Sequence, residues 1–188
     1  MKFDSSGHLI IEKDELLQIW SEALKSLIEI DQALLESDVQ ERAVCFRLAH
    51  YLSQFFLLAE KHRIFVDVEY NRDGEKRKKT PMPDQCTRHW IAPDIILHER
   101  GSADDPEDKY RNDIFYCEVK KNDSKNGSDK NRIIEQMCER KYQFGINLYQ
   151  INKNKIELAL RDLNKSSCRE IYAYSFEQGK LVKQIETE

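Results

Sequence analysis

The sequence predicts an α/β protein in which a central mixed β-sheet is flanked by helices. Two segments near the N-terminus carry apolar residues at helical spacing, whereas most later apolar segments alternate with polar residues as strands do. A helical pattern separates the third expected strand from the fourth, and such a helix allows the fourth strand to join the sheet by a right-handed crossover. Together these observations predict a sheet covered by helices, an α/β sandwich.

Two amphipathic helices are expected before the first strand. The first covers residues 14–35 and begins at Asp14, a good N-cap residue. Its apolar stripe consists of Leu17, Trp20, Leu24, Leu27 and Leu34. The second covers about residues 38–60, and its stripe consists of Cys45, Leu48, Leu52, Phe55 and Ala59. We interpret residues 1–36 as an N-terminal helical extension and residues 37–188 as the main domain.

Strands and one further helix account for the rest of the chain. The strands are expected over residues 64–71, 91–99, 115–122, 156–163, 170–176 and 180–186. The first three are consecutive and predict a meander. The helix is expected over residues 130–149, and Gly145 is expected to end or weaken it.

The composition limits the class of protein. The chain has 188 residues, 40% hydrophobic and 34% charged, which is consistent with one domain and a real core. No apolar run approaches the ~20 residues of a membrane span, and the N-terminus lacks the pattern of a signal peptide. Five widely spaced cysteines indicate reduced, buried thiols rather than a disulfide framework. We therefore expect a cytoplasmic protein.

The charge is distributed unevenly along the chain. The formal net charge is −4, which argues weakly against a dedicated nucleic-acid-binding protein. Residues 72–79 and 120–132, however, each carry five basic residues against two acidic ones. Such segments can contact a phosphate backbone, and solvated loops explain them equally well. The candidate phosphate contacts are Arg72, Lys76, Arg77, Lys78, Lys79 and Lys121.

The segment FYCEVKKN, residues 115–122, carries two opposite charges within an apolar strand. Alternation places Glu118 and Lys120 on the face opposite the core. Asp94 begins the preceding strand, so it can stand beside Glu118 if the two strands are neighbours. Two carboxylates at short range repel each other unless a cation lies between them, and Mg²⁺ takes such oxygen ligands. A cross-strand ion cluster of the same three residues is the alternative explanation.

These residues resemble the signature of the PD-(D/E)XK nuclease superfamily, which has the restriction-endonuclease-like fold. The signature here consists of Pro93-Asp94 and, 24 residues after Asp94, Glu118-Val119-Lys120. The expected order of elements over residues 38–163 is similar to the common core of that superfamily. The resemblance implies Mg²⁺-dependent (or Mn²⁺-dependent) hydrolysis of phosphodiester bonds in nucleic acid, with DNA endonuclease activity as the expectation.

The resemblance also implies a role for each residue of the signature. Asp94, Glu118 and the backbone carbonyl of Val119 would hold the metal. Lys120 would stabilise the charge that develops on the phosphate. In many members an acidic residue on the preceding helix completes the metal site, and Glu41 is the matching residue here. Glu41 lies on the apolar stripe of its helix, although a capping box at the start of that helix is the alternative explanation.

Two further polar residues are candidates for the site. VDVEYNR and the basic loop after it resemble a segment of small uncharacterised bacterial members of the superfamily, and Glu69 lies on the polar face of this strand. Glu69 is either a fourth carboxylate of the site or the partner of Arg72 or Lys120 in an ion pair. In some relatives a polar residue on the next helix contacts the site, and Gln136 is a candidate for that role.

The alternative function is a non-catalytic module of the same fold that binds nucleic acid or a protein partner. The superfamily includes such inactive relatives, and the net acidic charge is consistent with them. If the first helix exposes Trp20, Leu24 and Leu27, it presents an apolar face suited to a homodimer or to another protein.

Overall fold

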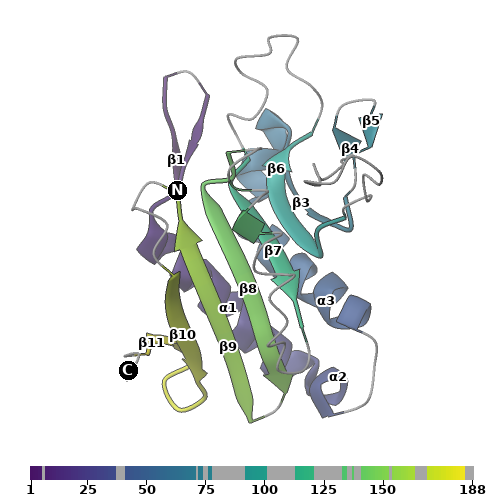
Figure 1. Ribbon diagram of the computed structural model, residues 1–188, viewed down its shortest axis with the longest axis vertical. Helices are drawn as coiled ribbons and strands as arrows, with labels where there is room; N and C mark the ends of the chain where they lie inside the picture. The colour runs from purple at the N-terminus through teal and green to yellow at the C-terminus, as the bar shows by residue number, and fades with distance from the viewer. Residues whose placement is uncertain are drawn as a thin grey trace, which may run out of the picture.

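A seven-stranded mixed β-sheet forms the centre of the protein, and helices cover it (Figure 1). The structure, a computed structural model, describes residues 1–5, 7–36, 41–70, 72–73, 76–77, 92–100, 113–120, 133–134, 137, 141–152, 154–163 and 169–184. This arrangement confirms the predicted α/β class with a mixed central sheet. None of the described helices is both long and apolar enough to cross a membrane.

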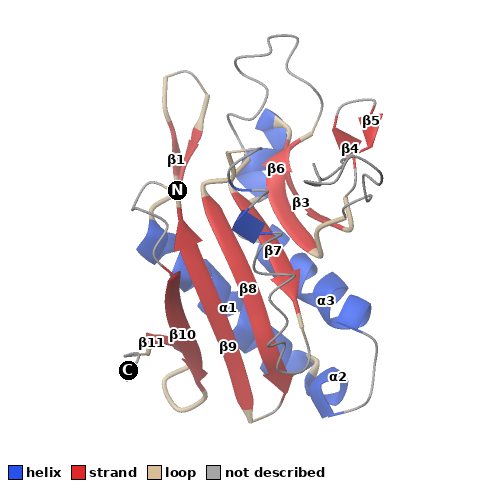
Figure 2. Cartoon of the chain, in the orientation of Figure 1, coloured by secondary structure: helices blue, strands red, loops and turns tan. Residues whose placement is uncertain are grey.

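The strands of the sheet lie side by side in the order in which they occur in the chain. From one edge to the other they are β3 (Ile64–Val68), β6 (Ile95–Glu99), β7 (Phe115–Val119), β8 (Phe144–Asn152), β9 (Lys155–Asp162), β10 (Arg169–Ser175) and β11 (Lys180–Lys183) (Figure 2). β7 and β8 run parallel, and the other neighbouring pairs of this sheet run antiparallel. β3, β6 and β7 thus form the predicted meander, and the strands predicted near the C-terminus are confirmed as β9, β10 and β11.

Two short hairpins accompany the sheet. β1 (Lys2–Phe3) pairs with β2 (Leu9–Ile10), and β4 (Arg72–Asp73) pairs with β5 (Lys76–Arg77). The second hairpin carries part of the predicted basic segment.

The helices precede the sheet in the chain and differ from the prediction at their ends. They are α1 (Lys13–Ile30), α2 (Gln32–Glu36), α3 (Glu41–Ser53) and the 3₁₀ helix η1 (Leu57–His62). The prediction of Asp14 as N-cap is wrong, because Glu12 takes that position and its side chain makes no capping hydrogen bond. Asp14 lies in the first turn, where its negative charge interacts favourably with the positive end of the helix dipole. α3 ends at Ser53, so Phe55 leaves the predicted stripe and is 39% exposed.

The first helix belongs to the main hydrophobic core. α1 and α3 pack on one face of the sheet, behind it in the view of Figure 1. The ring of Trp20 is fully buried and meets the ring of Phe115 on β7 edge to face, with 5.5 Å between centroids. The hydroxyl of Ser21 accepts a hydrogen bond of 2.9 Å from the backbone N–H of Leu181 on β11. α1 is therefore fastened to both the middle and one edge of the sheet.

The partner-binding face expected on the first helix is not available. Trp20, Leu24 and Leu27 are all fully buried in the core shared with the sheet. The prediction that this face binds a second copy or another protein is therefore wrong. An amphipathic pattern shows that one side of a helix is buried, but it does not say what covers that side.

The prediction of one helix over residues 130–149 is also wrong. Residues 133–134 and 137 are helical, but residues 144–149 belong to β8. β8, and not the segment 156–163, is therefore the strand that follows the crossover and pairs in parallel with β7. Ile133 and Met137 pack on the face of the sheet opposite α1 and α3, in a cluster with Ile96, Tyr116 and Tyr142.

Gly145 lies within β8 directly beneath this helical segment. A Cβ atom at this position would lie 2.4 Å from the Sδ atom of Met137 and 2.5 Å from the Cγ2 atom of Ile133. The absence of a side chain thus allows the segment to approach the strand closely. Gly145 therefore permits close packing. The prediction that it ends or weakens a helix is wrong, because it lies inside a strand.

Gly145→Ala is therefore expected to lower the free energy of unfolding by about 1–3 kcal/mol, because the added methyl group overfills a packed contact. Urea unfolding of the two proteins measures the difference. The cost should be smaller when Met137→Ala is already present, since that change removes the nearest atoms. Equal stability of Gly145→Ala and the parent protein would contradict this packing.

Candidate active site

The candidate site lies where the start of β6 and the end of β7 meet the first turn of α3. Ile95 pairs with Cys117 in the antiparallel register, so the preceding residue, Asp94, comes opposite Glu118. One carboxylate oxygen of Asp94 accepts a hydrogen bond of 2.7 Å from the backbone N–H of Val119. The two strands therefore bring the acidic residues of the signature together, as the sequence predicted.

Opposing influences act on the pKa of the Asp94 carboxyl group. Burial raises the pKa of Asp94 above its ordinary value, and the negative charge of Glu41 raises it further. The Val119 N–H, the Lys120 ammonium and a hydrogen bond with the Glu118 side chain act in the opposite direction. Two carboxyl groups at hydrogen-bonding distance cannot both be ionised without strong repulsion. A proton or a cation between them relieves that repulsion.

Glu118 is the most deeply buried acid of the site, with 1% of its surface exposed. Its Oε1 atom accepts a hydrogen bond of 2.6 Å from the hydroxyl of Tyr116, two residues earlier on the same strand face. A buried carboxylate requires such donors, because water no longer solvates it. This partner of Glu118 was not predicted from the sequence. Its only signal was the i, i+2 spacing, which places the two side chains on one face.

Lys120 and Glu41 form the more exposed side of the site. The Lys120 ammonium lies 3.4 Å from the Glu41 carboxylate, and their side chains are 29% and 41% exposed. Glu41 is the first residue of α3, and its contact with Lys120 places it toward the sheet, as expected. The capping-box alternative pairs Glu41 with Asp38, and Asp38 lies outside the described part of the chain.

Glu69 follows β3 and faces α3. Its carboxylate lies 2.6 Å from the guanidinium of Arg42, an ion pair that the sequence analysis did not anticipate. Glu69 has a positive φ of 51°, so it leaves the strand geometry from which its partners were predicted. The side chain of Arg72, one of those partners, lies outside the described residues.

Two buried thiols lie among these charges. Burial raises the pKa of the Cys45 thiol, and the charges of Asp94 and Glu41 raise it further. Burial likewise raises the pKa of the Cys117 thiol, with the charge of Asp94 as a further cause. Both thiols are free, which confirms the prediction of reduced, buried cysteines for this pair. The other three cysteines lie outside the described residues.

The ligand types at the site fit a small divalent cation. Mg²⁺ commonly binds through one or two carboxylates and keeps several waters, and Asp94 and Glu118 supply two such groups. Within the described ranges, no group of three or more His, Cys, Asp or Glu side chains is arranged to hold a metal ion.

Several predicted residues fall outside what the structure describes. Gln136, Lys78, Lys79 and Lys121 lie in segments without a description. Arg72, Lys76 and Arg77 lie on β4 and β5, where the backbone is described but the side chains are not. The predicted phosphate contacts therefore stay predictions.

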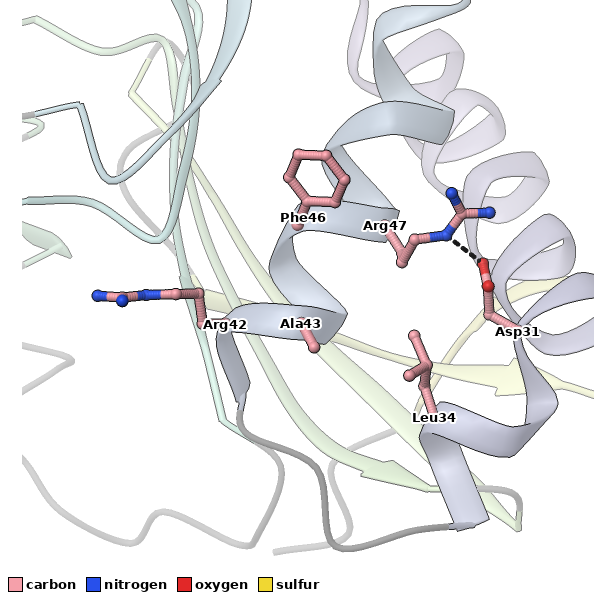
Figure 3. A pocket seen from close by; sticks show the side chains of 6 residues that line it. All are labelled: Asp31, Leu34, Arg42, Ala43, Phe46 and Arg47. Carbon is pink, nitrogen blue, oxygen red and sulfur yellow. Dashed lines mark hydrogen bonds and ion pairs between the residues drawn. The ribbon is translucent and has the colours of Figure 1, made fainter.

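An open pocket of about 690 Å³ lies along α3 (Figure 3). Its lining consists of Asp31, Leu34, Arg42, Ala43, Phe46 and Arg47. The guanidinium of Arg47 is held 2.8 Å from the Asp31 carboxylate, whereas Arg42 extends away from the other side chains, as Figure 3 shows. Phe46 is 63% exposed. This pocket was not predicted from the sequence, because Phe46 and Arg42 lie off the apolar stripe of their helix.

Comparison with known proteins found no similarity. No protein-family model matches the chain. No curated protein matches it. No solved structure matches it.

Proposed function

We propose that this protein is a Mg²⁺-dependent (or Mn²⁺-dependent) nuclease of the PD-(D/E)XK type, with the restriction-endonuclease-like fold and DNA endonuclease activity in the cytoplasm. One observation carries the proposal. Asp94 and Glu118 meet at the ends of two neighbouring strands, with the ion pair of Lys120 and Glu41 beside them. Buried carboxylates that could hold a divalent cation, next to a partly exposed ammonium, suit metal-assisted hydrolysis of a phosphodiester.

Each residue has a part that follows from its position. Asp94, Glu118 and the Val119 carbonyl would hold the cation, and Glu41 would bind it directly or through water. A bound divalent cation would polarise the phosphodiester and lower the pKa of a water molecule. Lys120, whose side chain is 29% exposed, would reach the substrate and stabilise the negative charge that develops on the phosphate. The hairpin of β4 and β5 would supply basic residues to the phosphate backbone.

The second candidate function is a non-catalytic module of the same fold that binds nucleic acid or a protein. The ion pair between Lys120 and Glu41 favours it, because such a pair can also be a purely structural contact. The response of the protein to a divalent metal distinguishes the two functions.

Mg²⁺ or Mn²⁺ is expected to raise the melting temperature of the protein by several degrees. At ~100 times Kd a ligand adds about 2.7 kcal/mol of stability, and this corresponds to several degrees for a domain of this size. The shift should shrink in Asp94→Asn and Glu118→Gln. Without metal these two variants should melt no lower than the parent protein, because the repulsion between carboxylates is gone. Differential scanning calorimetry with EDTA and with metal measures both effects.

Glu170→Gln is the matched control for this experiment. Glu170 also accepts hydrogen bonds, from Lys13 on α1 and from Lys183 on β11, but it lies on β10 away from the candidate site. The metal-dependent shift should be the same in this variant as in the parent protein. If metal has no effect and both site variants are strongly destabilised, the charges form a structural ion cluster and the nuclease proposal fails.

A further inference from the structure

We infer that Tyr116 is a positioning residue, whose hydroxyl fixes the carboxylate of Glu118 in the orientation that binds the divalent cation. This inference rests on the proposed function and adds a residue to its site. The superfamily signature does not include the position of Tyr116.

The contact itself is short and buried. The Tyr116 hydroxyl donates to Glu118 Oε1 at 2.6 Å. Tyr116 is fully buried and Glu118 is 1% exposed. A hydrogen bond from a neutral donor to a carboxylate at this length is of the strong, charge-assisted kind. It restricts rotation of the carboxylate about its terminal bond, which is otherwise a soft torsion.

The ring of Tyr116 cannot easily move with the carboxylate. It packs edge to face on Tyr142, with 5.6 Å between centroids. Ile96, Ile133 and Met137 complete the cluster around it. Tyr116 also lies opposite Gly145 in the parallel register, where the helical segment approaches the sheet closely. Ile133, Met137 and Tyr142, which lie between β7 and β8 in the chain, therefore hold the phenol ring in place, and its hydroxyl holds Glu118.

The hydrogen bond between Tyr116 and Glu118 is of the kind that orients the ligands of a metal site. A carboxylate that binds a metal is usually oriented by a hydrogen bond from a neighbouring group, and loss of that group lowers metal affinity about 10–100-fold. Burial strengthens the effect, because water cannot readily replace the missing donor.

Tyr116→Phe is expected to weaken Mn²⁺ binding by about 10–100-fold. The variant removes one oxygen atom and keeps the ring in its packed cluster. Mn²⁺ alone, titrated by calorimetry into the full-length protein, gives the affinity without any nucleic acid. The readout is therefore independent of cleavage activity.

Tyr172→Phe provides a closely matched control. The Tyr172 hydroxyl donates to Glu170 at 2.7 Å, the two residues are again two positions apart on one strand, and Tyr172 is 5% exposed. This variant loses the same kind of hydrogen bond away from the candidate site. Its Mn²⁺ affinity should equal that of the parent protein, even if its stability falls.

The outcomes separate the inference from the proposed function. If the parent protein binds Mn²⁺ and Tyr116→Phe binds it equally well, the positioning role is wrong and the metal site stands. If Tyr172→Phe weakens binding as much as Tyr116→Phe, the effect is a general loss of stability and the inference is overturned. If the parent protein binds no Mn²⁺, the proposed function and the inference both fail. Should Tyr116→Phe be partly unfolded, all three proteins are compared in sucrose, which favours the folded state.

Discussion

Lys120→Ala is expected to slow phosphodiester cleavage by a factor on the order of 10²–10³ if the lysine stabilises developing charge. The fold should survive, because the ion pair with Glu41 is partly exposed and such pairs contribute about 0–1 kcal/mol. Binding of substrate should change less than the rate, since the interaction is strongest in the transition state. The expected result is therefore a low rate constant in a stable protein.

The measurement compares cleavage of plasmid, linear and branched DNA and of RNA, in Mg²⁺ and in Mn²⁺. Glu118→Ala is expected to be inactive as well, because it removes a proposed metal ligand. Lys155→Ala is the control, since Lys155 also forms an ion pair with a glutamate, Glu157 on β9, at 2.7 Å. Unchanged activity of Glu118→Ala and Lys120→Ala on every substrate would contradict the proposal that these residues form the active site.

Trp20→Ala is expected to destabilise the protein by about 3–5 kcal/mol, a large part of the stability of an ordinary domain. Trp20 is fully buried between α1 and the sheet, and its loss leaves a cavity beside Phe115. Urea unfolding followed by circular dichroism measures the change. The size of the change shows whether α1 is part of the core or a loosely attached extension.

Ile30→Ala serves as the control on the same helix. Ile30 is 67% exposed, and substitutions at such positions usually change stability by less than about 0.5 kcal/mol. A cost below about 1 kcal/mol for Trp20→Ala would show that α1 does not form part of the core.

The meander and the helices that pack on it could be predicted because their apolar residues follow one clear period. Phe115, Cys117 and Val119 alternate with polar positions and are all buried in the main core. β8 could not be separated from the helix before it. No Gly or Pro stands between Met137 and Phe144, so the helical spacing runs into the strand without a break. Gly145, which resembled a helix terminator, serves the packing between the two elements.

The sequence could predict which residues of the candidate site lie close together wherever the motif itself fixes the neighbours. Antiparallel pairing of two adjacent strands places Asp94 opposite Glu118, and the helical stripe brings Glu41 toward Lys120. The partner of Glu69 could not be predicted, because its positive φ turns it toward α3 and Arg42.

The role of Tyr116 was not predictable for a different reason. Tyrosine is common in strands for its packing alone, so the sequence gives no sign that a particular hydroxyl meets a particular carboxylate.

The contact between α1 and β11 has a consequence for synthesis on the ribosome. Ser21 and Leu181 are 160 residues apart in the chain. At about 5–20 residues per second, roughly 8–30 s pass before the C-terminal strand that receives the helix has been made. During that time α3 and β7 can already cover part of the apolar side of α1, but the part that packs on β11 stays open to water. Synthesis in the N-to-C direction thus delays completion of the contact between α1 and the sheet until β11 leaves the ribosome.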